Sequence, residues 1–362
     1  MSNKQFDLLV FIGRFQPFSK AHEHVINEAL KLSNKVLILV GSSYQARSTR
    51  NPFTFDERAQ MIRGVFLDTD KIKILPLRDY PYNMSAWLNE AHRQIDTIAR
   101  NGKIGLIGYA KDHTSFYLKL FPKFESVSVD PFIDTRGKPL SATEIREQYF
   151  MNDGAIGFNT VPDHVRFGLY DFKKLQMFSE LSKEFAAIYD YKKMWSDVPF
   201  PPTFNTVDAV VVQAGHVLLI KRGDYPGKGL WALPGGFINE YEDLDDAVLR
   251  ELREETTIDV PPAILRKIMS APVVFSAPYR STRGRTITYA YLFDLDSEID
   301  RNTSRNMPIE KSIPKLNLPI GLTKVKGADD AIDAQWVKLS DIHEDEMFED
   351  HYSIIFKMLE TK

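Results

Sequence analysis

Short apolar runs alternate with helix-like segments through the first 150 residues, and this alternation restricts the fold more than any other feature of the chain. A run that is apolar at every position fits a strand buried on both faces, as in a parallel sheet covered by helices. We therefore predict a doubly wound, Rossmann-like α/β domain over residues 1–150, with its ligand beyond the carboxyl ends of the strands. The runs are LLVFIG (8–13), KVLILVG (35–41), KIKILPL (71–77) and KIGLIGY (103–109), and the helical segments span 23–33, 53–66 and 87–99.

Length and composition set further limits. The chain has 362 residues, which predicts about two domains. Its net charge of -3 gives no general attraction to nucleic acid or to an anionic membrane. It contains no cysteine, which excludes disulfides, thiolate catalysis and cysteine-ligated zinc. No apolar run reaches the roughly 18 residues of a membrane span, so we expect a cytoplasmic protein without nucleic acid or membrane partners.

Glycines end three of the predicted strands, at Gly13, Gly41 and Gly108. The stretch GRFQPFSKAH (13–22) follows the first strand, and a helix is expected to begin near its end. Backbone N–H groups at the start of a helix favour phosphate oxygens. His22 could donate a hydrogen bond to a phosphate that gains charge during a reaction. The other interpretation, a histidine that caps an ordinary strand–helix turn, stays open.

The stretch GRFQPFSKAH is similar to the G-x-F-x-P-x-H-x-G-H signature of nucleotidyltransferases, and it most resembles the archaeal-type branch of nicotinamide mononucleotide (NMN) adenylyltransferases. NPFTFDERAQMI (51–62) and GYAKDHTSFYLKLFP (108–122) agree with that family in order and spacing, and SATEIRE (141–147) resembles its late S/T-x-x-x-I-R phosphate motif. The resemblance implies adenylyl transfer from ATP to NMN with Mg²⁺, and His22 and Arg146 as catalytic residues. It implies contacts to ATP or NMN from Gly13, Arg14, Phe15, Ser19, Trp87, Gly108, Lys111, Asp112, Ser141, Thr143 and Arg146.

Arg146 and Trp87 each have an ordinary alternative. Arg146 would add a fixed cation for the β- and γ-phosphates, at a helix start that Ser141 and Thr143 can cap. It could also be a solvated helix residue. Trp87 would stack on the nicotinamide ring by resemblance, or it could be an ordinary core tryptophan.

Two positions depart from the signature, because Ser19 replaces its first histidine and Ala21 replaces its glycine. In such enzymes the NMN phosphate attacks the α-phosphorus of ATP, and the rate comes from alignment and charge stabilisation. A serine hydroxyl donates a hydrogen bond but carries no charge, and losing a donor to developing charge typically costs about 10²–10³ in rate. We therefore expect this domain to bind nucleotide and to transfer the adenylyl group at a reduced rate.

Residues 151–205 are predicted to form a helical linker. We expect a loop at 157–165, a single helix over 170–195, and an end to the helix at VPFPPTF (198–204), because consecutive prolines cannot continue it. The aromatic residues of this helix are interpreted as ordinary packing residues. Whether the helix packs on the first domain, on the second or on another subunit of a homo-oligomer is left open by the sequence.

Residues 206–362 carry a second pattern, in which a glycine turn precedes a helix with clustered carboxylates. Glu251, Glu254 and Glu255 stand at positions i, i+3 and i+4, hence on one helix face. Carboxylates this close repel unless a cation neutralises them, and ligands of oxygen alone favour Mg²⁺ or Mn²⁺. The alternative is a solvated acidic face. The segments concerned are the predicted strand pair VDAVVV (207–212) and HVLLI (216–220), and LWALPGGFINEYEDLDDAVLRELREETTI (230–258).

The last of these segments matches the Nudix box, G-x5-E-x7-R-E-U-x-E-E-x-G-U, except that Thr257 replaces the final glycine. The resemblance to Nudix hydrolases implies an α/β/α sandwich with a mixed sheet, and hydrolysis of a diphosphate joined to a nucleoside. We expect Arg250 to pair with Glu242 and so to hold the glycine turn. Asp329 and Asp330 are candidates for the general base or for a further metal ligand, with a polar turn as the alternative. Metal ligation is implied for Gly236, Glu251, Glu254 and Glu255.

The substrate is indicated by two further stretches, KRGDYPGKGLWALPGGF (221–237) and FSAPYRSTRGRTITYAY (275–291), which resemble the ADP-ribose pyrophosphatase branch of that superfamily. The resemblance implies that ADP-ribose and water give AMP and ribose 5-phosphate. Each arginine could also be a surface residue. Contacts to ADP-ribose are expected from Arg222, Arg280, Arg283 and Arg285, and from an aromatic ring such as Phe237 or Tyr279.

Both modules in this order resemble the bacterial family of bifunctional NMN adenylyltransferase/ADP-ribose pyrophosphatases, whose substrates are ATP, NMN and ADP-ribose. Two alternatives stay open. One is a Nudix hydrolase alone, with a first domain that only binds nucleotide, and Ser19 is the best argument for it. The other is a regulator that senses NAD metabolites, although the acidic segment after Trp336 lacks the basic helix that reading DNA requires.

Overall fold

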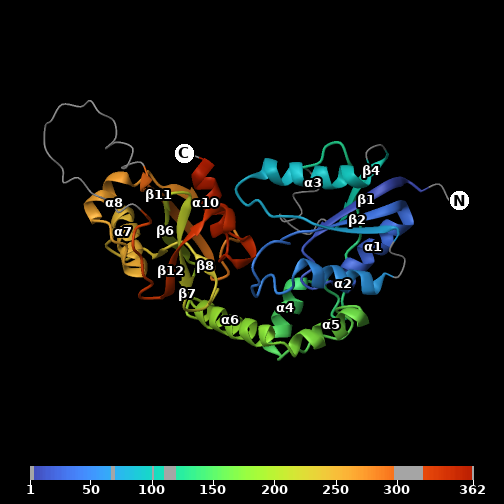
Figure 1. Ribbon diagram of the computed structural model, residues 1–362. Coiled ribbons are helices and arrows are strands. Elements are labelled where there is room, and N and C mark those ends of the chain that lie inside the picture. The colour runs from blue at the N-terminus through green and yellow to red at the C-terminus, as the bar shows by residue number, and fades with distance from the viewer. Residues whose placement is uncertain (1–3, 67–69, 100–101, 110–119, 297–320, 361–362) are drawn as a thin grey trace. The chain divides into compact units, whose positions relative to one another are not determined.

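The computed structural model describes residues 4–66, 70–99, 102–109, 120–296 and 321–360. The chain divides into two compact units, with the boundary between Ala186 and Ala187 (Figure 1). Lys111 and Asp112, two of the predicted nucleotide contacts, lie outside the described residues. None of the helices in the described ranges combines the length and the apolar character that a membrane crossing requires.

The first unit contains a five-stranded parallel sheet with the order β3-β2-β1-β4-β5, which confirms the predicted doubly wound sheet. The central strand is apolar from Leu8 to Ile12 because Leu9 and Phe11 are buried in one core and Leu8 and Val10 in another. The strand order reverses beside β1, where a crevice for ligands is expected at the carboxyl ends of the strands. The strands are β1 (Phe6–Gly13), β2 (Ser33–Val40), β3 (Ile72–Pro76), β4 (Ile104–Gly108) and β5 (Glu125–Ser128).

Helices cover both faces of this sheet (Figure 1). The helices α1 (Lys20–Leu32) and α2 (Phe55–Val65) pack on one face, and α3 (Met84–Ile98) packs on the other. Local side chains fix where α2 and α3 begin. Thr54 and Glu57 form a capping box at the start of α2, and Asn83 accepts a hydrogen bond from the backbone N–H of Ala86 at 3.0 Å.

The single helix predicted over residues 170–195 is wrong, because the chain forms α5 (Asp163–Lys173) and α6 (Gln176–Lys193) with a turn between them. The segment 157–165, predicted as a loop, already contains the start of α5. Both Phe172 and Phe178 are buried in the core of the first unit, which also receives α4 (Ala142–Met151). On a continuous helix, residues six apart point about 120° away from each other. The turn between α5 and α6 lets both rings enter the same core.

The second unit contains a seven-stranded mixed sheet, in which β6 and β11 are parallel and the other pairs are antiparallel. The predicted pairing of residues 207–212 with 216–220 is confirmed by the β6–β7 hairpin. The main path has the order β10-β11-β6-β7-β12, while β8 pairs with β7 and β9 pairs with β6. The strands are β6 (Thr203–Gln213), β7 (His216–Arg222), β8 (Trp231–Ala232), β9 (Gly235–Phe237), β10 (Val273–Phe275), β11 (Arg285–Asp294) and β12 (Ala331–Lys338).

Helices also cover both faces of the mixed sheet, so the predicted α/β/α sandwich is confirmed (Figure 1). On one face, α7 (Leu244–Thr256) buries Ala247, Val248 and Leu252 completely, and α8 (Pro262–Ile268) lies beside it. On the other face lies α10 (His351–Glu360). Two short 3-10 turns, η2 (Leu339–Asp341) and η3 (Glu344–Glu346), come before α10.

Candidate active sites

The turn after β1 is built around Phe15, whose ring is buried and lies 5.3 Å from the ring of Phe11. Phe15 has a φ of 52°, a left-handed conformation that a non-glycine residue adopts only when its surroundings hold it there. Its side chain is therefore part of the core. A contact from Phe15 to a nucleotide would have to come from its backbone.

Arg58 connects the turns that follow β1 and β2. Its guanidinium is completely buried and donates hydrogen bonds to the carbonyl oxygens of Arg14 at 2.6 Å, Gly41 at 2.7 Å and Ser42 at 3.1 Å. Burial lowers the pKa of Arg58 to about 10, so the group still carries its charge at neutral pH. This one side chain brings together two of the three predicted glycine turns. Sequence reasoning did not select it, although it lies within the family-like segment 51–62.

Arg146 of α4 reaches the same turn from a distant part of the chain. Its Nη1 donates to the carbonyl oxygen of Gln16 at 2.7 Å, and its Nη2 donates to Thr143 Oγ1 at 3.2 Å. Arg146 is buried, so it is not the solvated helix residue that the sequence left as an alternative. The Gln16 side chain in turn exchanges two hydrogen bonds with the backbone of Phe53, at 2.8 and 3.0 Å. The loop before α1 is thus held on two sides.

Positive charge gathers around this loop. The pKa of Arg146 is lowered to about 9, first by burial and then by the like charges of Arg14 and Arg50. An anion between these guanidinium groups would offset their mutual repulsion, and a triphosphate carries several negative charges. The arrangement supports the predicted triphosphate site. Arg50 is a member that sequence reasoning missed.

Ser19 and His22 contact each other at the start of α1. The backbone N–H of Ser19 donates to Nδ1 of His22 at 3.0 Å, and the Ser19 hydroxyl oxygen lies 2.9 Å from the same atom. Nδ1 is therefore an acceptor, so the neutral ring carries its proton on Nε2. Burial lowers the pKa of His22 to about 4. The ring is therefore a neutral donor through Nε2 at physiological pH. Because the cap uses Nδ1, Nε2 is left to donate to a phosphate, and the two roles of His22 are compatible.

The remaining predicted residues of the first site are distributed over both faces of its sheet. Trp87 lies on the α3 face, half-buried, with its ring edge-on to Phe121 at 6.1 Å. Gly108 ends β4, and Ser141 stands at the N-cap of α4 without a side-chain cap hydrogen bond. The expectation that Ser141 caps through its hydroxyl is therefore wrong, while Thr143 bonds Arg146 instead.

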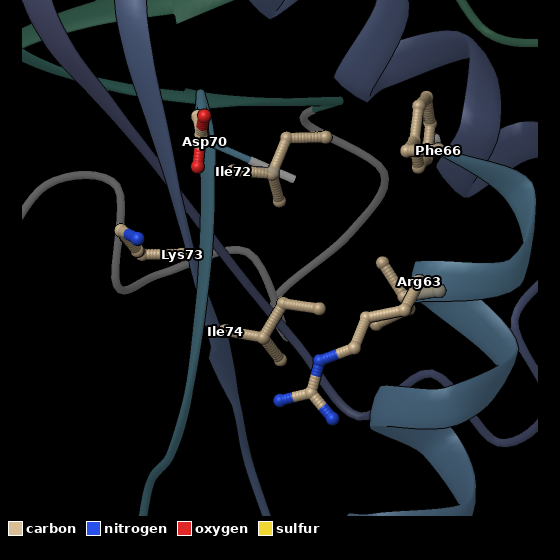
Figure 2. Close-up of a pocket in the computed structure, with 7 residues that line it drawn as sticks. Arg63, Phe66, Asp70, Ile72, Lys73 and Ile74 are labelled. Carbon is tan, nitrogen blue, oxygen red and sulfur yellow. The ribbon is translucent and has the colours of Figure 1, made fainter. Parts of the chain in front are cut away.

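A separate cavity of about 230 Å³ lies between α2 and β3 (Figure 2). Arg63 and Phe66 come from α2 and the residue after it, and Ile72 and Ile74 come from β3. The lining uses the amino-terminal half of β3, whereas the predicted site lies at the carboxyl ends of the strands. This cavity therefore shares no residue with the predicted nucleotide site.

In the second unit, Gly235 and Gly236 were predicted as a turn but follow a bend at Pro234 and begin strand β9. This segment, called the glycine turn below, lies directly against the carboxylates of α7. The backbone N–H of Gly235 donates to Glu255 Oε2 at 2.8 Å. A Cβ atom on Gly236 would stand 2.6 Å from Glu251 Oε1, so a larger residue here would push the carboxylate of Glu251 away. Folding therefore brings Gly236 beside Glu251 and Gly235 beside Glu255, while metal ligation by these groups stays a prediction.

Arg250 holds this arrangement from the outside. It donates to both carboxylate oxygens of Glu242, at 2.7 and 2.9 Å, which confirms the predicted pair. It also donates to Glu251 at 2.8 Å, to Glu254 at 3.0 Å and to the carbonyl oxygen of Phe237 at 3.2 Å. The hydrogen bonds with Glu242 raise the pKa of Arg250 further above its usual value. One guanidinium therefore links the loop, the turn and the helix.

The acidic side chains suit a hard divalent cation in their chemistry. Burial raises the pKa of Glu255 to about 8 and also raises that of Glu251, a penalty that a bound cation would reverse. Within the described ranges, no group of three or more acidic or histidine side chains stands close enough together to hold a metal ion. Arg250 instead neutralises Glu251 and Glu254, so a bound metal would replace Arg250 as the cation that neutralises these carboxylates.

The predicted contacts to ADP-ribose are not all equally available. Arg280 is buried and forms a two-fold ion pair with Asp350, at 2.9 and 3.0 Å, so it would have to leave that partner to bind a ligand. Arg283 lies with its guanidinium carbon 5.0 Å from the ring centroid of Phe237, next to the glycine turn. Arg222 lies 4.2 Å from the ring centroid of Phe348. Arg285 donates to the carbonyl oxygen of Ser276 at 2.8 Å.

A buried polar network beneath the turn was missed by sequence reasoning. Asp208 of β6 accepts a hydrogen bond from the Thr288 hydroxyl at 2.6 Å and lies 3.9 Å from Arg280. His351 accepts a hydrogen bond at Nδ1 from the backbone N–H of Leu233 at 2.9 Å, and burial lowers its pKa to about 3. These groups come from strands and a helix far apart in the sequence. The only local signal was a charged residue inside the apolar run VDAVVV.

Three further residues of the second site occupy turns. Thr257, which replaces the glycine of the box, adopts a φ of 42° at the end of α7 and bonds the carbonyl oxygen of Lys326 at 3.1 Å. Asp329 has a φ of 52° and Asp330 accepts a backbone hydrogen bond from Gly223 at 2.9 Å. Both aspartates are exposed, and either remains a candidate for the general base.

Comparison with known families agrees with this division of the chain. A model described as cytidylyltransferase-like matches residues 10–148, and a model of the NUDIX domain matches residues 202–358. The chain is 35% identical over 186 residues to the nicotinamide/nicotinic acid mononucleotide adenylyltransferase of Acinetobacter baylyi, covering 51% of this chain and 95% of that one. It is 38% identical over 89 residues to the ADP-ribose pyrophosphatase of Methanocaldococcus jannaschii, covering 25% of this chain and 49% of that one.

A solved structure that resembles both units together comes from one relative. It is a bifunctional NMN adenylyltransferase/ADP ribose pyrophosphatase from Francisella tularensis, complexed with AMP and a manganese ion. The similarity has a TM-score of 0.85 at 35% identity and covers 98% of this chain and 99% of that one. Both halves of the present chain therefore have counterparts, in the same order, in a single relative.

Proposed function

The chain belongs to the family of bifunctional NMN adenylyltransferase/ADP-ribose pyrophosphatases, and from this premise we propose that it catalyses two reactions of NAD metabolism in the cytoplasm. The first unit transfers the adenylyl group of ATP to NMN, giving NAD and diphosphate. The second hydrolyses ADP-ribose to AMP and ribose 5-phosphate. One observation carries the proposal: in each unit, the predicted motif contacts the loop or glycine segment nearby. Arg146 bonds the loop before α1, and Glu251 and Glu255 lie against Gly236 and Gly235.

Adenylyl transfer needs alignment and charge stabilisation rather than a protein nucleophile. Arg14, Arg50 and Arg146 supply fixed positive charge for the triphosphate, as their mutual effect on the pKa of Arg146 supports. His22 would donate its Nε2 proton as a hydrogen bond to a phosphate oxygen. Ser19 supports this orientation of the ring, so the loss of the first signature histidine leaves the second one positioned. We therefore propose an active transferase rather than a nucleotide-binding relic.

Hydrolysis of ADP-ribose would use the carboxylates of α7. Glu251, Glu254 and Glu255, with the Gly236 carbonyl, are the proposed holders of Mg²⁺ or Mn²⁺. A bound divalent cation supplies Lewis-acid stabilisation of the diphosphate and lowers the pKa of water. Arg250 keeps the loop and the helix together, and Arg283 stands beside the turn to meet the diphosphate.

Both activities can be tested on one preparation. The protein is incubated with Mg²⁺, ATP and either NMN or nicotinic acid mononucleotide, and separately with Mg²⁺ and ADP-ribose, and the products are identified by chromatography. We expect a dinucleotide and diphosphate in the first reaction, and AMP with ribose 5-phosphate in the second. Chelation of the metal with EDTA should stop both reactions. Intact ADP-ribose alongside consumption of another nucleotide sugar would overturn the hydrolase assignment, and no dinucleotide product would overturn the transferase assignment.

A further inference from the structure

Four aromatic rings form a continuous group beside the catalytic turn of the second unit. Tyr191 lies in the last turn of α6, Trp195 follows that helix, Phe204 lies in β6 and Phe237 lies in β9. The centroids of Tyr191 and Trp195 stand 5.6 and 5.7 Å from that of Phe204, and Phe204 stands 5.9 Å from Phe237. All four residues belong to the second unit.

The group is only partly covered. Phe204 in its centre is half-buried, whereas the side chains of Trp195 and Phe237 remain 40% and 38% exposed at its two ends. Large aromatic side chains that share a patch and stay in water are unfavourable without a ligand to cover them, and such patches mark binding sites. Ordinary packing, which the sequence suggested for the linker aromatics, does not account for the exposed side chain of Trp195.

The position of the group relates it to the proposed chemistry. Phe237 directly follows Gly236, and its carbonyl oxygen accepts a hydrogen bond from Arg250 at 3.2 Å. The guanidinium of Arg283 lies over the Phe237 ring. A ligand whose diphosphate reaches Arg283 and the carboxylates of α7 would therefore carry its flat, uncharged end toward Phe204 and Trp195.

We propose that this aromatic group binds the adenine base of ADP-ribose, with Trp195 providing the main stacking surface. The inference rests on the proposed hydrolysis of ADP-ribose and names the residues that would recognise the base. Stacking on an aromatic side chain needs only the π-face of the base, and removing such a side chain typically weakens binding by about 5- to 100-fold. The segment after α6 thus belongs to the second active site.

The test compares W195A and W195F with the control F200A in the full chain. Phe200 lies in the same segment and is 80% exposed, so its replacement removes an aromatic ring without touching the group. We expect W195A to raise the KM for ADP-ribose about 10-fold or more with kcat within about twofold, W195F to stay within about threefold of the wild type, and F200A to match the wild type.

Inhibition by the two products separates recognition of the base from recognition of the sugar phosphate. AMP should inhibit W195A about 10-fold more weakly than the wild type, while inhibition by ribose 5-phosphate should be unchanged. A wild-type protein that leaves ADP-ribose intact would contradict the proposed function itself. Hydrolysis with an unchanged KM in W195A, or an equal change in F200A, would overturn this inference alone.

Discussion

Single side chains decide what each site can do, and the contact between Ser19 and His22 shows it in the first unit. The serine replaces a histidine of the signature, yet its backbone N–H fixes Nδ1 of His22 as an acceptor. His22 therefore keeps one defined donor, Nε2–H, and its lowered pKa keeps it neutral through the physiological range. The site has one histidine where the signature has two, and the reduced rate of adenylyl transfer stays a prediction.

Replacing His22 tests this role. In H22A, NAD formation from NMN and ATP should fall by about 10²–10³, because a donor aimed at developing charge is lost. Hydrolysis of ADP-ribose by the same molecule serves as an internal control and should stay within about twofold. H24A, two residues further along α1, is the matched control and should keep the wild-type rate of NAD formation. Unimpaired synthesis by H22A would show that the ring is only a helix cap.

His351 makes the stability of the second unit dependent on pH. Its folded pKa of about 3 lies below the ordinary value of 6.5, so the unfolded chain binds a proton that the folded chain excludes. This contribution to stability is complete above pH 6.5 and is lost as the pH falls toward 3, with a slope of about 1.4 kcal/mol per pH unit. In H351Q, whose amide oxygen can still accept from Leu233, the loss between pH 7 and pH 5 should be smaller by about 2 kcal/mol.

Urea denaturation of both proteins at pH 5 and pH 7 measures this difference. H343Q, which replaces an exposed histidine shortly before α10, is the control and should behave as the wild type does. An H351Q protein that loses as much stability on acidification as the wild type would show that His351 is protonated in the folded state.

At the scale of elements, the second site depends on a turn and a helix that meet. At Gly236 a carboxylate of α7 fills the space where a side chain would begin, and at Gly235 the carbonyl oxygen of Val207 in β6 fills it. Arg250 fixes the same approach by bonding Glu242, Glu251 and Glu254 at once. The metal-binding role proposed for the helix would thus depend on the backbone of the segment before it.

Replacing Gly236 with alanine should lower the rate of hydrolysis, whereas an alanine at another glycine should lower only the stability. The new Cβ would force Glu251 away, so hydrolysis of ADP-ribose should fall by on the order of 100-fold, comparable to removal of a stabilising group in the transition state. The control G215A places alanine in the β6–β7 hairpin at a φ of 72° with open space around it. It should cost about 1 kcal/mol in stability and leave hydrolysis unchanged. Equal activity of G236A and G215A would contradict the close approach of Glu251.

At the scale of the whole molecule, the two units have separate cores and separate sheets. The core of the first unit ends with residues of α6, and the core of the second is formed from β6 onward. Among the described residues, each proposed site takes its side chains from one unit. Chemical changes confined to one site should therefore leave the other site intact.

The variant E255Q tests this separation. Glutamine keeps an oxygen that can accept from Gly235 but removes the negative charge, so hydrolysis should fall by about 10²-fold or more with the loss of metal-based stabilisation. NAD formation by the same protein should remain within about twofold. A parallel loss of both activities would show that the glutamate affects the entire chain and not the second site alone.

The sequence predicted the features that depend on residues close together along the chain. The apolar runs at 8–13 and 35–41 indicated buried parallel strands, and the spacing of Glu251, Glu254 and Glu255 placed them on one helix face. The pair between Arg250 and Glu242 lies within eight residues and was predicted correctly. Periodicity and spacing record such features directly because strand and helix geometry repeat at fixed intervals.

Only the tertiary structure decided which distant residues meet. Arg58 joins two turns, Arg146 reaches Gln16 across 130 positions, and Arg280 pairs with Asp350 across 70. The break between α5 and α6 likewise lets Phe172 and Phe178 enter one core. Such contacts leave no periodic trace in a single sequence, because they arise when separate elements pack together. The sequence thus determined the elements and the chemistry they carry, and packing determined which of those groups share a site.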